Sequence, residues 1–400
     1  MTATGEGGVW RGPALFSRGF RPFFLFGALY AGLIVALWVP WYLGLVLPPS
    51  AFPPTAWHVH ELLFGYVPAI MAGFLLTVLP GWTGRPPLGG WPLILLLLLW
   101  LAGRAAVGLS SLLGMPATAL ACLAFPASLV AKAGRDIVAG RSWRNLKILL
   151  VVSAFFACQA AFEWEIWRFG RSLHAERLAI AAVLLLIMLI GGRIIPLFTG
   201  NWLKTRGASS LPAPFGRYDL AALAVGAAAL VAWAIPDAFP PRGWLGALLL
   251  LAGLLHLGRQ IRWQPHRTCA EPLVAILHVA YGFLPAGFVL AGCAVLLDSA
   301  PQAAAAIHAW TVGAIGTMTL AIMTRASLGQ TGRVLKAGPF TIALYAAIVA
   351  ATAARVAVAL RPDWTMTLMP AAGLFWILAF LGFAAAYGPM LLTRRRDGVS

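Results

Sequence analysis

Residues 57–85 read WHVHELLFGYVPAIMAGFLLTVLPGWTGR, a segment that is apolar enough to cross a bilayer yet opens with two imidazoles and a carboxylate. Ionisable groups inside a membrane are costly, about 2.5 kcal/mol or more each at the bilayer centre, and are functional by default. The opening residues His58, His60 and Glu61 are therefore the first candidates for a site.

The same stretch has a counterpart near the C-terminus, at a constant offset of 248 residues. The matching pairs are His60 and His308, Gly65 and Gly313, Gly81 and Gly329, Thr83 and Thr331, Gly84 and Gly332, and Arg85 and Arg333. A constant offset predicts an internal repeat of 60–85 in 308–333. A weaker copy spans 174–200 and opens with His174.

The composition is typical of polytopic membrane proteins, because 61% of the 400 residues are hydrophobic and only 10% are charged. Twelve segments have about the ~20 apolar residues that a bilayer requires. They lie near 22–47, 58–80, 90–113, 116–139, 145–165, 174–199, 217–236, 242–260, 271–296, 302–326, 337–360 and 366–392. We therefore expect an all-α fold of about twelve transmembrane helices in one membrane domain, 22–392, between an N-terminal tail, 1–21, and a basic tail, 393–400.

Two further features of the chain narrow its class. The N-terminus lacks a short apolar core followed by a cleavage site, so we expect no removable signal peptide. The cysteines have no CxxC spacing, which indicates neither a disulfide framework nor a thiolate metal site. We expect core positions for Cys122, Cys158, Cys269 and Cys293.

The basic residues set the expected orientation. With the N-terminus inside, all but seven of the 29 Lys and Arg residues fall on inner segments. The positive-inside rule then predicts that both termini and both tails are cytoplasmic. The net charge of +17 needs no nucleic acid, since basic loops contact the anionic head groups of the lipid bilayer.

With this orientation, the predicted second, sixth and tenth helices all run from outside to inside and all open with histidine. A four-helix period predicts three similar units with imidazoles at the periplasmic side. Neutral histidine suits iron and copper, and histidines from facing helices commonly hold haem in bundles. Because His60 and His308 are repeat mates at one depth, they are the expected ligand pair for one metal or haem iron.

Other histidines remain as candidates. Two residues turn a helix by about 200°, so His58 either serves a different metal from His60 or precedes the regular helix. His174 is a third metal candidate, or else a histidine at the membrane interface. His278 lies within the ninth predicted helix, where it can be a second ligand or a proton relay.

Two arginines are expected at the depth of these histidines. A guanidinium pairs well with a carboxylate such as a haem propionate, so Arg104 and Arg355 are candidates for binding an anionic cofactor group. The alternative is an internal ion pair. Its expected partners are Glu163, Glu165 or Asp298.

The quoted motifs resemble a known family. FRPFFL (20–25), WHVHELLFG (57–65), GFLLTVLPGWTGRPPL (73–88), GGRIIPLFTGNWL (191–203) and HAWTVGAIGTMTLAIMTRASLGQTGR (308–333) are similar to the NnrS family. The resemblance runs from about residue 18 to the C-terminus. It implies a bacterial inner-membrane protein that is associated with haem and copper and is produced in denitrification or the nitric-oxide response.

The layout of three four-helix units also resembles the catalytic subunit of haem-copper oxidases and nitric oxide reductases. The predicted seventh helix has no histidine where those enzymes carry a pair, and the tenth offers only His308. A haem with a three-histidine copper centre of that design is therefore not expected.

Two classes of function remain open. The first is a haem or haem-copper protein that binds nitric oxide or turns it over, in the latter case as an oxidoreductase with an unknown electron donor. The second is a transporter or exporter of metal or small molecules, since twelve helices with repeats also fit that class.

Overall fold

The computed structural model describes residues 10–46, 48–238 and 243–394, and within these ranges it is helical without strands. Twelve helices are long and apolar enough to span a membrane, which confirms the all-α prediction. These spans are α1 (Phe20–Tyr42), α2 to α3 (Pro54–Thr83), α4 (Trp91–Gly108), α6 (Met115–Ala139), α7 with its preceding turn (Trp143–Phe169), α8 to α9 (Ala175–Thr205), α10 (Arg217–Ala234), α11 (Gly243–Ile261), α12 (Pro272–Leu296), α13 to α14 (Ala300–Gln330), α15 (Pro339–Leu360) and α16 with its preceding turn (Pro362–Leu392).

The second, sixth and tenth spans share a wide turn of π-helix. In the second span the π segment His60–Tyr66 joins α2 (Pro54–Val59) to α3 (Val67–Thr83). In the sixth, Ile187–Gly191 joins α8 (Ala175–Leu186) to α9 (Gly192–Thr205), and in the tenth, Ala309–Gly316 joins α13 (Ala300–His308) to α14 (Thr317–Gln330). Because π segments are rare and are frequent at functional sites, their recurrence supports the four-helix period.

Contacts between neighbouring spans arrange them in three consecutive groups, the last of which packs back on the first. Within the groups, α4 packs on α6, α10 on α11, and α15 on α16. Contacts of α6 with α7, α11 with α12, and α16 with α1 join one group to the next. The second and tenth spans are the most buried of the twelve, so they form the interior of the bundle.

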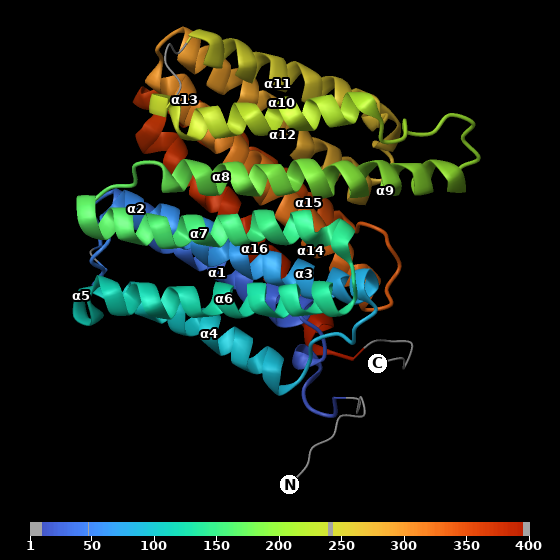
Figure 1. Cartoon of the computed structure of the whole chain (residues 1–400), viewed down its shortest axis with the longest axis horizontal. Helices are drawn as coiled ribbons and strands as arrows, with labels where there is room; N and C mark the ends of the chain where they lie inside the picture. Colours follow the sequence, from blue (N-terminus) through green and yellow to red (C-terminus); the bar gives the residue numbers. More distant parts are fainter. Residues whose placement is uncertain (1–9, 47, 239–242, 395–400) are drawn as a thin grey trace.

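The two ends of the described chain meet at one end of the bundle, where the guanidinium of Arg394 donates to the carbonyl of Arg11 (3.2 Å). The short helices α2 and α5 (Ser110–Leu113) lie at the opposite end (Figure 1). We call these the terminus end and the far end. An even number of spans places both ends of the described chain on the same side of the membrane. That this side is the cytoplasm stays a prediction.

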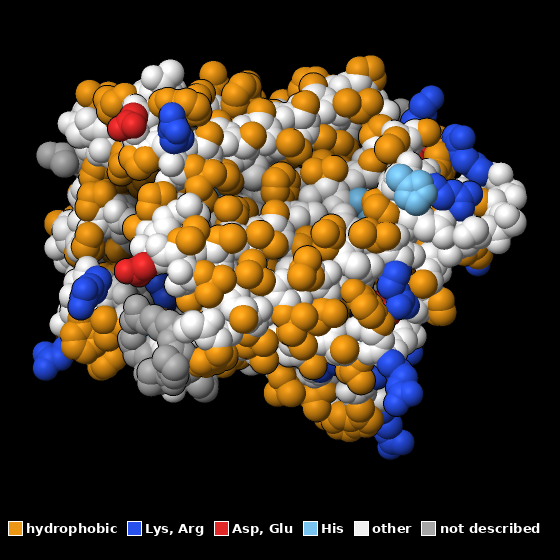
Figure 2. Space-filling model, turned by 90° about the horizontal axis from the view of Figure 1, so that it is seen from above, with side chains coloured by type: hydrophobic (Ala, Val, Ile, Leu, Met, Phe, Trp, Pro, Cys, Tyr) orange, Lys and Arg blue, Asp and Glu red, His pale blue; other side chains and the backbone are white. Residues whose placement is uncertain are grey.

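The surface between the two ends is apolar. Leucines on outward-facing positions, such as Leu33, Leu98 and Leu378, are more than half exposed, as expected for side chains that contact lipid. Figure 2 shows hydrophobic side chains across the middle of the molecule and Lys and Arg toward its ends. The bundle therefore has the apolar surface belt, between its two ends, that is typical of a membrane protein.

Candidate functional site

The two histidines of the second span face opposite sides, as their separation along the helix requires. The His58 ring stacks on the Trp38 ring of α1, with centroids 3.8 Å apart and planes 24° apart. The His60 ring instead lies between Phe52 and Phe162, at centroid distances of 5.1 and 6.0 Å. The segment therefore contributes to two separate sites.

The first site is an apolar cavity of about 300 Å³ toward the far end, which we call the histidine cavity. His58 and His308 both line it, from the second and tenth spans, and Arg355 of α15 lines it as well. Its aromatic walls are Trp38, Tyr42, Tyr66 and Trp376. The cavity thus gathers two imidazoles and a guanidinium in apolar surroundings at the lower end of the ~300–1,000 Å³ range of small-molecule sites.

The Nδ1 atom of His58 is buried and has no hydrogen-bond partner in the described part of the chain. A buried polar atom without a partner costs about 1–3 kcal/mol, so this ring nitrogen calls for a group that satisfies it. The same cavity is lined by one carboxylate among the described residues, that of Glu176 of α8. No ion pair joins Glu176 to Arg355 among the described residues, so the guanidinium is free to bind an anion.

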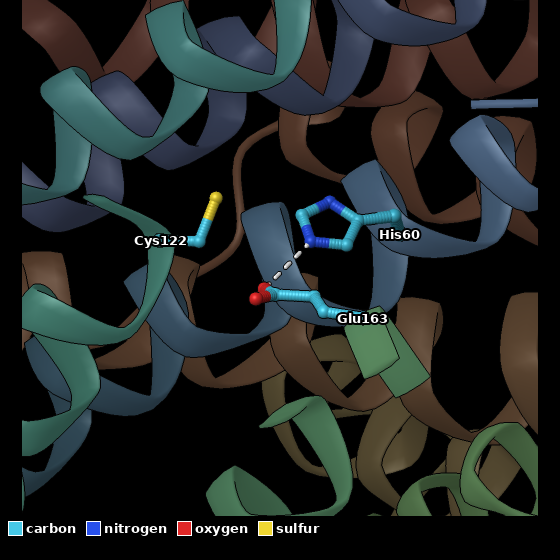
Figure 3. Close-up of side chains that lie close together, drawn as sticks. All are labelled: His60, Cys122 and Glu163. Carbon is cyan, nitrogen blue, oxygen red and sulfur yellow. Dashed lines mark hydrogen bonds and ion pairs between the residues drawn. The ribbon is translucent and has the colours of Figure 1, made fainter. Parts of the chain in front are cut away.

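The second site is a packed polar cluster, which we call the His60 cluster. Its members come from the second to fifth spans and are His60, Glu61, Arg104, Cys122, Gln159 and Glu163. His60 contacts a carboxylate through each ring nitrogen, Glu61 at 2.6 Å and Glu163 at 3.2 Å. Figure 3 shows His60, Glu163 and Cys122 pointing toward one another.

Arg104 holds the other side of the cluster together. Its guanidinium donates to Glu61 Oε1 (2.6 Å) and approaches Cys122 Sγ (3.8 Å). Gly65 makes room for it, since a Cβ at that position would lie 2.8 Å from an Arg104 nitrogen. Gln159 donates to Glu163 Oε1 (3.0 Å), while Glu163 Oε2 is buried without a partner among the described residues.

The charges of the His60 cluster do not balance within the protein. Glu61 and Glu163 are 1% and 2% exposed and bring two negative charges when ionised, whereas Arg104 brings one positive charge. Uncompensated buried charge is strongly destabilising, so the cluster requires one more positive charge, either a proton or a metal cation. His60, Cys122 and Glu163 offer ligand atoms within 4.8 Å of one another, which suits a metal ion.

The two sites occupy matching positions in the repeat. The His60 cluster lies between the second, third, fourth and fifth spans. The histidine cavity is lined by the tenth, eleventh, twelfth and first spans, together with the first half of the second and the start of the sixth. His308 and Arg355 in the cavity therefore come from the spans that correspond to those of His60 and Arg104.

The comparison with known proteins agrees with the motifs. A family model described as the NnrS protein matches residues 14–395. The chain belongs to the NnrS family. Membership makes it a membrane protein of the nitric-oxide response, and the family is generally associated with metals. No curated protein matches the chain.

In this NnrS protein the expected ligand pair is divided between the two sites. The residues that line the histidine cavity include His308 and His58 but not His60, whose ring nitrogens face Glu61 and Glu163. The packing of the spans explains the difference, because His60 turns toward the third, fourth and fifth spans, whereas His308 turns toward the cavity. The structure thus brings His308 together with His58.

The two candidate arginines, Arg104 and Arg355, also belong to different sites. Arg104 forms an internal ion pair, the alternative considered for it, but its partner is Glu61 rather than Glu163, Glu165 or Asp298. Arg355 lines the histidine cavity and forms no ion pair with a described carboxylate. Binding of an anionic cofactor group stays a prediction, and the geometry favours Arg355 for it.

The remaining candidate histidines lie apart from both sites. His278 of α12 is buried and its Nε2 lies 2.8 Å from the hydroxyl of Thr199. His174 precedes α8, and its backbone amide donates to Glu165 (3.3 Å). Neither lines the histidine cavity among the residues described, and their metal roles stay predictions.

Sequence reasoning missed Cys122 as a possible ligand and considered Glu163 only as a partner for Arg104. Cys122 is buried, as expected of a core residue, and its thiol also belongs to the possible metal set. The expectation of a core position is wrong for Cys269, which is exposed, while Cys158 and Cys293 are half-buried. A signal for Glu163 was present, because Gln159 and Glu163 stand four residues apart on one face of a largely apolar helix. No comparable signal identified Cys122.

Proposed function

We propose that this NnrS protein holds a haem in the histidine cavity, with His58 and His308 as the candidate iron ligands, and binds nitric oxide there. The observation that carries the proposal is that imidazoles from two spans, those of His58 and His308, line one apolar cavity. Haem in helix bundles is commonly held by histidines from facing helices. The residues present therefore fit the group.

The protein residues around the cavity have distinct tasks in this proposal. Trp38 fixes the His58 ring by stacking on it, and Arg355 offers a cation to the propionates. Tyr66 and Trp376 form apolar walls that exclude water and disfavour charged competitors. Haem held by both imidazoles would supply an iron that takes a diatomic gas in exchange for one of them, and the apolar surroundings suit a small uncharged molecule such as nitric oxide.

We further propose that the His60 cluster holds a copper ion through His60, Cys122 and Glu163. Imidazole suits copper, and a thiolate favours its reduced form. A bound cation adds positive charge beside the buried carboxylates, and it gives Glu163 Oε2 a partner. Glu61 then orients the imidazole by accepting a hydrogen bond from His60 Nδ1, as outer-shell carboxylates do in metal sites.

The haem proposal is tested with His58→Ala, His308→Ala and the control His266→Ala. We expect the first two variants to lose the haem absorption spectrum and its change on addition of nitric oxide. His266 is exposed in the 3₁₀ turn Pro265–Thr268, so the control should keep both. Haem is measured per folded protein, with folding checked by circular dichroism. Full haem content in folded His58→Ala and His308→Ala proteins would refute the assignment.

A further inference from the structure

A second and larger cavity opens between the spans toward the terminus end. It has a volume of about 980 Å³ and is lined by the second, sixth and tenth spans together with the starts of α7 and α10 and the end of α11. We call it the basic cavity, because six of its lining residues are cations and one, Asp219, is an acid. The cations are Arg144, Lys147, Arg193, Lys204, Arg259 and Arg325.

The single carboxylate is already engaged. Asp219 Oδ1 accepts from Arg259 Nε (2.9 Å), and Oδ2 accepts from the amide of Gly216 (3.0 Å) and from Arg262 (3.4 Å). Asp219 is 2% exposed, so its charge is held inside the wall. It cannot neutralise the other cations of the cavity.

The other five cations form no ion pair with any carboxylate of a described residue. Basic residues at the cytoplasmic ends of helices are common, but most of them fringe the lipid surface. Here they come from four different elements and line one cavity, where an anion would lower their mutual repulsion. Four of them are exposed and one is half-buried, so their charges are accessible to such an anion.

The uncharged residues that line the basic cavity indicate which other chemical groups the bound anion carries. Phe74, Trp82 and Trp263 contribute aromatic walls, and the Arg325 guanidinium lies 4.0 Å above the centre of the Phe198 ring. Asn201 and Gln330 add amide donors, which bind oxygen atoms. An inorganic ion alone would leave much of this apolar surface unused.

We propose that the basic cavity binds a phosphate-bearing anion with an apolar body. Arginine and lysine form short charge-assisted hydrogen bonds to phosphate, and basic pockets between spans at the cytoplasmic side bind anionic lipid head groups. A phospholipid in the surrounding leaflet and a soluble organophosphate are the two sources of this chemistry. The proposal is independent of haem and copper, because none of the residues of the His60 cluster and neither ligand of the histidine cavity lines this cavity.

The test uses the full chain in a neutral detergent, with native mass spectrometry to count bound molecules. Phosphatidylglycerol, phosphatidylcholine and ATP are added separately at matched concentrations. The variant Arg193→Gln/Lys204→Gln removes two cavity cations. The matched control, Arg85→Gln/Arg135→Gln, removes two exposed cations that do not line the cavity.

We expect the wild-type and control proteins to retain phosphatidylglycerol or ATP, and the cavity variant to bind it about tenfold more weakly. Retention of phosphatidylglycerol identifies a lipid ligand, whereas retention of ATP alone identifies a soluble phosphate. Circular dichroism and the melting temperature without ligand check that each variant is folded. Equal binding of phosphatidylcholine and phosphatidylglycerol with no ATP bound, or equal losses in the cavity and control variants, would overturn the proposal.

Discussion

The His60 cluster and the histidine cavity are two versions of one position in the repeat. Each has a histidine near the start of a π segment and an arginine on the following span, His60 with Arg104 and His308 with Arg355. In the cluster the protein fills the space with carboxylates, an amide and a thiol. In the cavity it leaves about 300 Å³ open between aromatic walls. Corresponding spans of the repeat therefore form a compact polar site in one case and an apolar cavity in the other.

The sharpest separation of the two sites is in their metal contents. His60→Ala removes an imidazole from the proposed copper set, so we expect the loss of one copper equivalent while the haem spectrum persists. His58→Ala should give the reverse pattern. Metal analysis by mass spectrometry and the optical spectrum of the same samples check both. If each variant lost both groups, the two sites would not be independent.

The arginines should differ strongly in their effect on stability. Arg104→Ala leaves the buried carboxylates Glu61 and Glu163 without their cation, and we expect a loss of about 3–5 kcal/mol in the free energy of unfolding. Arg355→Ala, in protein without haem, should cost less than about 1 kcal/mol because it breaks no ion pair with a described carboxylate. Unfolding in mixed detergent micelles measures both. Adding Glu61→Gln to Arg104→Ala should recover part of the loss, and equal losses in the two single variants would contradict the comparison.

The smallest effects concern single neutral side chains. Gln159→Leu removes a hydrogen bond to Glu163 and should cost about 1.5–3 kcal/mol, as for bonds to charged groups. Tyr66→Phe, at the wall of the cavity, removes a bond to the Thr319 hydroxyl (2.6 Å) and should cost about 0.5–1.5 kcal/mol. The same unfolding assay ranks them. A larger cost for Tyr66→Phe would show that the cavity wall, rather than the cluster, is the more tightly bonded region.

Much of the fold could be predicted from the sequence, because the period of four spans and the apolar lengths depend on local composition. The twelve spans and the special standing of the second, sixth and tenth follow from residues such as His60, His308 and the glycines around them. The ends of the spans differ from the predicted ends by a few residues; α1, for example, ends at Tyr42 rather than near 47.

The composition of the sites was harder to predict, because it depends on how spans meet. The offset between His60 and His308 identifies equivalent residues but carries no information on whether the symmetry places them face to face. Apart from the adjacent Glu61, the groups around His60 include Cys122 and Glu163 of the fourth and fifth spans, which have no counterpart in the repeat motif. Only packing brings them together.

The contact between the chain ends has a consequence for how such a molecule is assembled. Short connections, 140–142 and 262–271, link α6 to α7 and α11 to α12, but no peptide bond links α16 to α1. Non-covalent contacts close that third junction, among them the bond from the Arg21 guanidinium to the carbonyl of Leu391 (2.9 Å). Because the ends already meet, a linker joining them would span little distance, and the connection at 262–271 could be opened instead. The folded protein would then keep the same contacts between the three groups if synthesis began with a different group.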